Sequence, residues 1–370
     1  MAIIPLCSPQ LRFKRFSIAI SEAIQRVLDG TQFILGREVE RFEQNFAAYL
    51  GVRHCVAVNS GTDALILALR SLGIGPGDEV ITVSMTFTAT AMAVLHTGAQ
   101  PRFVDVDPAT RCMDLTQVEA AMTPRTAAIV PVHLHGYPMD MSRLMALAEH
   151  HRLAVVEDCA QAHGSRIAGR AAGSWGQLGA FSFYPTKNLG GLGDGGAVVT
   201  QDPALAARIR ALRTYGWFDE RRISAELAHN SRLDELQAAV LNALLPHLEE
   251  GNRERAAIAV RYCALFEGAD VDLPAEHPGA VYHQFAICVG PRDALRSYLK
   301  ERAGIETGIH YPVPLHHQPL FAGYAAAPLP VTDHLARSMV SLPIQPEVVG
   351  DRVADIVRNV RDGIAECRES

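Results

Sequence analysis

Four short segments of the sequence carry residue types that could do chemistry together. The first, Ser60-Gly61-Thr62, lies between a strand-like and a helix-like segment. Glycine lets the backbone come close to a ligand, and free N–H groups at a helix start favour an anion such as phosphate. The same tripeptide is also typical of a helix cap in a tight turn. Because GxxxxGK[ST] and GxGxxG are both absent, it is neither a Walker loop nor a dinucleotide-binding turn.

The second segment is the acidic pair Glu157-Asp158, which ends the apolar run LAVV. Ligands of open parallel sheets lie beyond the carboxyl ends of the strands. A partly buried acid at such a place needs a cationic partner. A protonated pyridine nitrogen is one such partner, and a helix cap is the alternative role. Gln161 and His163 follow directly and are expected to face the same opening.

The third segment, FSFYPTKNLGGLGDGG, places Lys187 between an aromatic strand and a glycine-rich turn. Desolvation there would lower the pKa of the amine, and the neutral amine forms a Schiff base with an aldehyde. Most lysines are instead solvated surface charges. Ser182 precedes Lys187 and could hydrogen-bond a phosphate. The fourth segment holds Asn230 and Arg232, which are also typical of a helix cap with an ion pair.

Together these segments place a phosphate-binding turn, a strand-end acid and a lysine behind a strand in that order. This is the order expected for pyridoxal 5′-phosphate (PLP) on a large α/β domain. The acid would keep the pyridine nitrogen protonated, which makes the ring an electron sink, and the lysine would hold the aldehyde.

The elements that must position these residues alternate along the chain. Strand-like apolar segments are expected at 54–61, 78–85, 101–107, 127–134 and 153–160, and helices at 17–30, 37–50, 62–73, 115–122 and 141–151. Such alternation predicts an α/β fold with a mainly parallel sheet covered by helices. Segments 180–185 and 195–200 are too close together for a crossover helix, so they are expected to pair antiparallel.

A second unit is expected after a long helical region that starts near Leu233 and is interrupted at Pro246. A strand, a helix and the Pro/His-rich loop GIHYPVPLHHQP follow it. A length of 370 residues is itself typical of two domains. We therefore expect a large domain over 1–245 and a smaller C-terminal domain over 246–370.

Composition narrows the class of protein. A net charge of −6 with 48% hydrophobic residues indicates a globular chain without affinity for nucleic acid or anionic membrane. No apolar run approaches the ~20 residues that span a bilayer, and the start lacks a signal-peptide pattern. Seven scattered cysteines without a CxxC pair exclude a disulfide framework and a cysteine zinc site. A cytoplasmic enzyme without a metal is expected.

The chain resembles the DegT/DnrJ/EryC1/StrS family of PLP-dependent sugar aminotransferases. The resemblance covers nearly the whole chain and rests on VNSGTDAL, GDEVITVSMTFTAT, PVHLHGYPMDM, VEDCAQAHG, FSFYPTKNLGGLGDGGAVVT and NSRLDELQAA. It implies the aspartate-aminotransferase-type architecture (fold type I), with a mainly parallel seven-stranded sheet in the large domain and a smaller α+β C-terminal domain.

The resemblance also implies roles for single residues. Lys187 would be the Schiff-base lysine and proton shuttle, Asp158 would pair with the pyridine nitrogen, and Gln161 would contact the ring oxygen. Phe87 would stack on the ring. The phosphate would be held by Gly61, Thr62 and Ser182, with Ser60 nearby, and by Asn230 of the neighbouring subunit, which implies a homodimer with shared sites. The candidates for the sugar are His163, His310, Tyr311 and His316, and those for the nucleotide diphosphate are Arg213 and Arg221.

The implied reaction moves an amino group from L-glutamate to a nucleotide-linked ketosugar, with PLP and its amine form PMP as cofactor. The stretch around Lys187 is more similar to enzymes acting at C3 of dTDP-3-keto-6-deoxyhexoses than to the C4 branch. A C4 aminotransferase and a PLP-dependent sugar dehydratase are the alternatives within the family, although the dehydratase branch has histidine in place of this lysine. A non-catalytic PLP-binding regulatory subunit is the alternative from another class.

Overall fold

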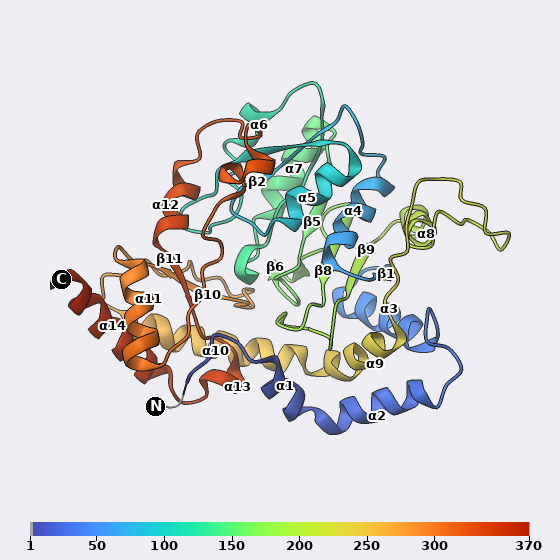
Figure 1. Ribbon diagram of the computed structural model, residues 1–370. Coiled ribbons are helices and arrows are strands. Elements are labelled where there is room, and N and C mark those ends of the chain that lie inside the picture. Colours follow the sequence, from blue (N-terminus) through green and yellow to red (C-terminus); the bar gives the residue numbers. More distant parts are fainter. Residues whose placement is uncertain (1–2, 370) are drawn as a thin grey trace.

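The computed structural model describes residues 3–369, and its centre is a seven-stranded sheet with the strand order β1-β9-β8-β5-β4-β2-β3 (Figure 1). The strands are β1 (His54–Val58), β2 (Glu79–Val83), β3 (Gln100–Val104), β4 (Thr126–Ile129), β5 (Ala154–Asp158), β8 (Leu178–Ser182) and β9 (Gly196–Thr200). Only β9 runs antiparallel to its two neighbours in this sheet. The predicted mainly parallel sheet and the antiparallel pairing of β8 with β9 are both confirmed.

Helices cover both faces of the sheet, which explains why its strands are apolar on both sides. One face packs on α4 (Gly61–Ser71), α5 (Ala89–Thr97) and α8 (Pro203–Leu212). The other face packs on α2 (Ser17–Leu28), α3 (Arg37–Leu50), α6 (Val118–Ala121), α7 (Met141–His151) and α9 (Glu235–Leu244). Strand β2 is buried at every position.

The predicted helices are present: those at 37–50 and 141–151 have the predicted bounds, whereas α2, α4 and α6 end one or two residues earlier. The 37–50 helix is α3, and Gly51 closes it in the left-handed conformation with φ 72°. Gly30 lies just beyond α2. Several helices were not predicted, among them α1 (Pro9–Arg15) and α5, whose residues are apolar without a helical period.

The long helical region is interrupted where it was predicted to be. Pro246 lies in a 3-10 turn (Leu245–His247) between α9 and α10 (Leu248–Phe266). Beyond it, β10 (Phe285–Cys288) and β11 (Met339–Leu342) form a small antiparallel sheet. The other elements of this part are α11 (Arg292–Ala303), α12 (Pro330–Ser338), α13 (Pro346–Val349), α14 (Val353–Glu369) and the 3-10 turns Leu315–His317 and Pro319–Phe321.

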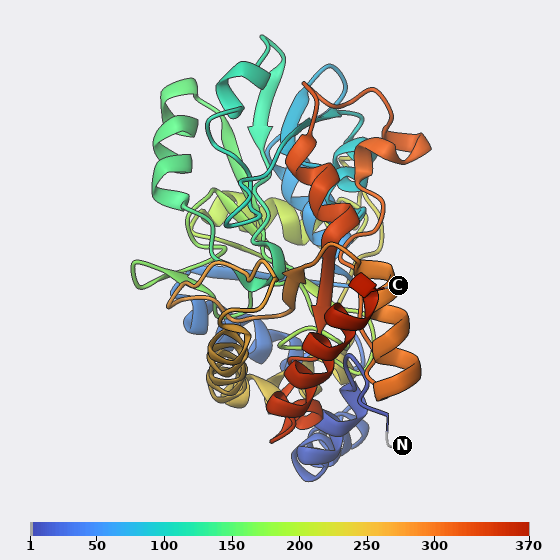
Figure 2. The same ribbon diagram turned by 90° about the vertical axis from the view of Figure 1, so that its left-hand side faces the viewer.

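This C-terminal part has a hydrophobic core of its own. Residues of α10, α11, α13 and α14 pack with the small sheet, and α11 and α14 lie side by side in Figure 2. Leu248 still packs with the large sheet, whereas Ile258 of the same helix packs in the C-terminal core. This change supports our proposal that the large domain ends near residue 245. Among residues 3–369, no helix is long and apolar enough to cross a membrane.

Candidate active site

Several of the predicted cofactor-site residues gather at one edge of the sheet, where β5 ends at Asp158 and β8 ends at Ser182. Strand β1 is antiparallel to β9, which is antiparallel to β8, so β1 ends at this same edge. Helix α4 therefore begins beside the end of β8. Lys187 follows in the turn after β8.

The start of α4 has the geometry of an anion-binding cradle. The hydroxyl of Ser60 accepts a hydrogen bond from the amide of Asp63 at 3.1 Å, which is normal N-capping. The amides of Gly61 and Thr62 precede it in the first turn of α4, where backbone N–H groups have no acceptor within the helix. A Cβ on Gly61 would lie 2.5 Å from the Cβ of Ser182, so only glycine allows this close approach.

Asp158 is a buried carboxylate at the end of β5. Its Oδ2 accepts a hydrogen bond from the hydroxyl of Thr90 at 2.8 Å, and its Oδ1 accepts one from the amide of Ala160 at 3.1 Å. Burial raises the pKa of Asp158, while these hydrogen bonds and the positive charge of Lys187 oppose the rise. A cation brought to this carboxylate would therefore be stabilised. Thr90 was not predicted as a site residue.

Lys187 is half-buried, and desolvation lowers its pKa to about 8, against the opposing effect of the Asp158 charge. A lysine with such a pKa is partly neutral near pH 7–8 and can act as a nucleophile and base.

The turn that carries Lys187 is held by an arginine that the sequence did not single out. Nη1 of Arg12, in α1, donates to the carbonyl oxygens of Lys187 at 2.6 Å and Asn188 at 3.2 Å. Nη2 of Arg12 donates to the carbonyl oxygens of Pro185 at 2.6 Å and Gly190 at 3.4 Å. One side chain thus fixes the backbone on both sides of the lysine.

A further group of contacting side chains consists of Gln161, Tyr311 and Phe87. The Oε1 of Gln161 accepts a hydrogen bond from the amide of His135 at 2.6 Å, and its Nε2 donates to the Tyr311 hydroxyl at 3.0 Å. The ring of Phe87 is 55% exposed and its centroid lies 5.8 Å from that of Tyr311. An exposed aromatic ring at this edge can stack on a planar ligand.

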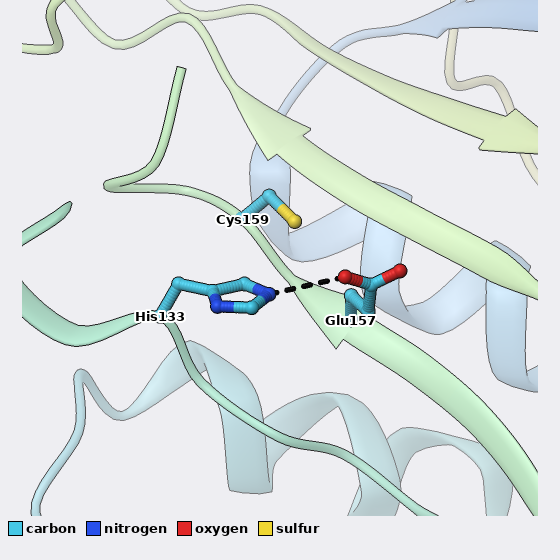
Figure 3. A group of neighbouring side chains, drawn as sticks. All are labelled: His133, Glu157 and Cys159. Carbon is cyan, nitrogen blue, oxygen red and sulfur yellow. Dashed lines mark hydrogen bonds and ion pairs between the residues drawn. The ribbon is translucent and has the colours of Figure 1, made fainter. Parts of the chain in front are cut away.

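Glu157, the neighbour of Asp158, stabilises the fold and does not face the site. Consecutive side chains of a strand point to opposite faces. The Glu157 carboxylate accepts hydrogen bonds from the amides of Gly173, Trp175 and Gly176, and from Nε2 of His133 at 3.1 Å (Figure 3). With four donors on its two oxygens, Glu157 stabilises the loop before β8 and has little capacity left for a ligand.

The predicted sugar-side residues lie in different surroundings. His163 is fully buried against the rings of Phe181 and Phe183, and burial lowers its pKa to about 3. Nδ1 of His310 is hydrogen-bonded to the Ser341 hydroxyl at 2.9 Å. Burial and then the Lys187 charge lower the pKa of His310 to about 4, so the structure brings this imidazole near the lysine.

The two predicted nucleotide-binding arginines are not brought together with Lys187. Arg213 is buried, and its Nη1 donates to Oε1 of Glu43 at 2.5 Å and to the Ala57 carbonyl at 2.8 Å. Arg221 is exposed in the loop after α8 and pairs with Asp219 at 2.6 Å.

Asn230 is exposed at the end of that loop. A nearby cavity of about 430 Å³ opens beside the α4 cradle; it is lined by Asn59, Ser60, Asp194, Arg232, Asp234 and Gln237. This leaves the phosphate side of the cradle accessible from outside the chain.

Comparison with known proteins matches residues 17–361 to the DegT/DnrJ/EryC1/StrS aminotransferase family. A dTDP-3-amino-3,4,6-trideoxy-alpha-D-glucose transaminase of Streptomyces venezuelae is 47% identical, over 97% of this chain and 96% of the relative. A UDP-N-acetyl-3-dehydro-alpha-D-glucosamine 3-aminotransferase of Acidithiobacillus ferrooxidans is 46% identical over 97% of both chains. The crystal structure of S. venezuelae DesV in complex with a ketimine intermediate superposes with a TM-score of 0.94, at 46% identity and over 98% of both chains.

Proposed function

The chain belongs to the DegT/DnrJ/EryC1/StrS aminotransferase family, and on this premise we propose that it transfers an amino group from L-glutamate to C3 of a nucleotide-linked keto-deoxysugar. The single observation that carries this proposal is Lys187, a half-buried amine with a lowered pKa at the sheet edge that holds Asp158 and the α4 cradle. An aminotransferase of this family uses PLP as its cofactor.

The residues at the sheet edge fit that cofactor. The α4 start and Ser182 offer N–H and O–H donors to a phosphate, and the missing side chain of Gly61 lets the two approach each other closely. The buried Asp158 carboxylate, with its raised pKa, gains from a pyridinium proton. Phe87 offers an exposed ring face for stacking. When bound, PLP withdraws electrons from the amino-acid Cα and carries the amino group between two substrates.

The chain's own groups supply the proton transfers. Lys187 would hold the cofactor when it is bound, and its free amine would act as a base at the donor Cα and as an acid toward the cofactor. Its lowered pKa suits both roles near neutral pH, since an ordinary lysine would stay protonated. Arg12 keeps the Lys187 backbone in place during both half-reactions through the two 2.6 Å hydrogen bonds. In the second half-reaction, Lys187 returns a proton to the sugar carbon.

Amination at C3 is favoured over C4, because the two relatives above are both named for a 3-amino or 3-dehydro sugar. Their nucleotides differ, and we propose a dTDP-linked 3-keto-6-deoxyhexose as substrate. The test is mass spectrometry and NMR of products from a panel of dTDP- and UDP-linked 3-keto and 4-keto sugars with glutamate. A 3-amino dTDP-sugar and 2-oxoglutarate in equal amounts are expected. Product from 4-keto sugars alone would overturn the C3 assignment.

We also propose a homodimer that shares its active sites. Large apolar side chains are exposed beside the cavity at the α4 cradle: Phe33, Ile34, Leu192 and Leu236. A second copy covering this patch would reach the cradle with its own Asn230.

We propose a cytoplasmic location for the enzyme. The described cysteines are all unpaired, which supports this proposal.

Subunit mixing tests the shared site. Asn230→Asp places a negative charge beside the phosphate, and Lys187→Ala removes the nucleophile, so each variant alone is expected to be poorly active at limiting PLP. In a mixed dimer one active site contains both substitutions and the other contains neither, so the unaltered site should restore activity. No return, with subunit exchange verified by native mass spectrometry, would remove the shared-site proposal and leave the role of Lys187 untouched.

A further inference from the structure

A cluster of two imidazoles and one carboxylate includes His316, one of the predicted sugar-side residues, which the structure pairs with Ser84 and Asp333. His316 and His317 end the 3-10 turn Leu315–His317, and Asp333 lies in the first half of α12. Oδ1 of Asp333 is 3.3 Å from Nε2 of His316 and 2.7 Å from Nε2 of His317. The three ligand atoms all lie within 4.8 Å of one another.

The three ligand atoms are close enough to bind one metal ion after only small movements of their side chains. Zinc bonds of about 2.0–2.1 Å in a tetrahedron place neighbouring ligand atoms about 3.3 Å apart. Both imidazoles present Nε2 to the same carboxylate oxygen, so one cation could replace the two N–H donors. We propose that His316, His317 and Asp333 bind one zinc-class divalent cation, with a water molecule in the fourth position.

The surroundings of the cluster support this assignment. Nδ1 of His316 is 2.7 Å from the hydroxyl of Ser84, which leaves Nε2 free to face the cation and fixes the ring. A hydrogen bond at the second ring nitrogen is the usual arrangement of a metal-binding histidine. The buried carboxylate of Asp105 holds the start of α12 through Val331 and Thr332, and its negative charge acts on His316.

The chain offers two contrasting groups that would not bind in this way. The buried group of His133, Glu157 and Cys159 is also compact (Figure 3). Its carboxylate already accepts hydrogen bonds from three backbone amides and from Nε2 of His133, and Nδ1 of His133 accepts one from the amide of Met139. His150 and His151 are likewise adjacent, and Nε2 of His151 pairs with the Glu119 carboxylate at 2.9 Å, whereas His150 contacts the ring of His151. This second pair provides a matched control.

A cation at the cluster would join three parts of the chain. It would link the turn after Tyr311 to α12, while Ser84 connects the same turn to the end of β2. The segment that carries His310 and Tyr311 toward Lys187 would therefore be anchored at its far end. The site is then a structural clamp rather than a catalytic metal centre.

The test is isothermal titration of tag-free, chelator-treated holoenzyme with ZnCl₂. Wild type and the His151→Gln control are expected to bind one zinc ion with a Kd of 10 µM or below. Asp333→Asn and His317→Gln are expected to bind at least tenfold more weakly. Zinc should also raise the melting temperature of the first two proteins and not of the last two.

Two results would overturn the proposal. One is a wild-type enzyme that binds no zinc at 100 µM. The other is equal affinity in all four proteins, which would place the bound zinc elsewhere on the surface. The side chain of His317 is 54% exposed, so His317→Gln is expected to fold. This variant can therefore test the proposal even if Asp333→Asn fails to fold.

Discussion

Arg12 offers a sharp test of how the fold positions its nucleophile. Replacing it by methionine keeps the length of an unbranched side chain and removes every donor to the turn that carries Lys187. The two hydrogen bonds at 2.6 Å, to the carbonyls of Lys187 and Pro185, are lost outright. The two longer ones, to Asn188 and Gly190, are lost as well.

The expected magnitude follows from these contacts. Hydrogen bonds to a charged group contribute about 1.5–3 kcal/mol each, so the two short ones contribute roughly 3–6 kcal/mol. Burial lowers the pKa of Arg12, which shows that desolvating the guanidinium offsets part of this gain. We expect Arg12→Met to reduce the free energy of unfolding by about 2–4 kcal/mol. A shift of the lysine by 1 Å would in addition lower kcat by about 10²-fold.

The assay combines urea unfolding with steady-state kinetics on the folded, PLP-loaded enzyme. Arg15→Met is the control, because Arg15 lies on the same helix and pairs with Glu250 at 3.1 Å, Glu254 at 2.9 Å and Glu347 at 3.5 Å instead of with the turn of Lys187. Such pairs contribute about 0.2–1 kcal/mol, so its kcat should stay near wild type. If Arg12→Met is less stable yet keeps full kcat per folded molecule, Arg12 stabilises the fold without positioning Lys187, and the reasoning is refuted.

Other predictions concern the residues of the sheet edge. Lys187→Ala should lower kcat by at least about 10²–10⁴-fold with an unchanged circular dichroism spectrum; turnover within a few-fold of wild type would contradict its role. In the cofactor-free enzyme, the unfolded chain keeps the Lys187 proton up to pH 10.5 while the folded chain loses it near pH 8, so urea stability should rise with pH across this window and rise less in Lys187→Ala. Gly61→Ala should release PLP on dialysis because of its 2.5 Å contact with Ser182, whereas Gly251→Ala, in open space, should retain it. Asp158→Asn should impair kcat more than Asp158→Glu; equal activity of Asp158→Asn and wild type would reduce this carboxylate to a helix cap.

Much of the large domain was predictable because its strands are short apolar runs between turns. The sequence order of the cradle, Asp158 and Lys187 also predicted their meeting at one edge, since parallel strands end together. Helix α5 was not predicted, because a segment that is apolar all round has no helical period. Thr90 was missed with it, although it donates directly to Asp158.

The roles of several residues could not be predicted, because they depend on contacts with residues far away in the sequence. Arg12 is 175 residues from Lys187 along the chain, and no local pattern connects them. Arg213 was predicted to bind the nucleotide diphosphate, but Glu43, 170 residues away along the chain, holds it in the interior. The His317–Asp333 contact likewise joins residues of two separate elements. Residue type indicates possible chemistry, but only packing shows which groups are already occupied.

The most direct test of the central claim is the absorption spectrum of the PLP-loaded enzyme during one turnover of each half-reaction. On addition of glutamate alone, the band of lysine-bound PLP should give way to that of PMP, with one 2-oxoglutarate formed per site. A dTDP-linked 3-keto sugar should then restore the first band, and Lys187→Ala should show neither change at a comparable rate. A wild-type spectrum that glutamate leaves unchanged would contradict the account and favour a protein that binds PLP without transamination.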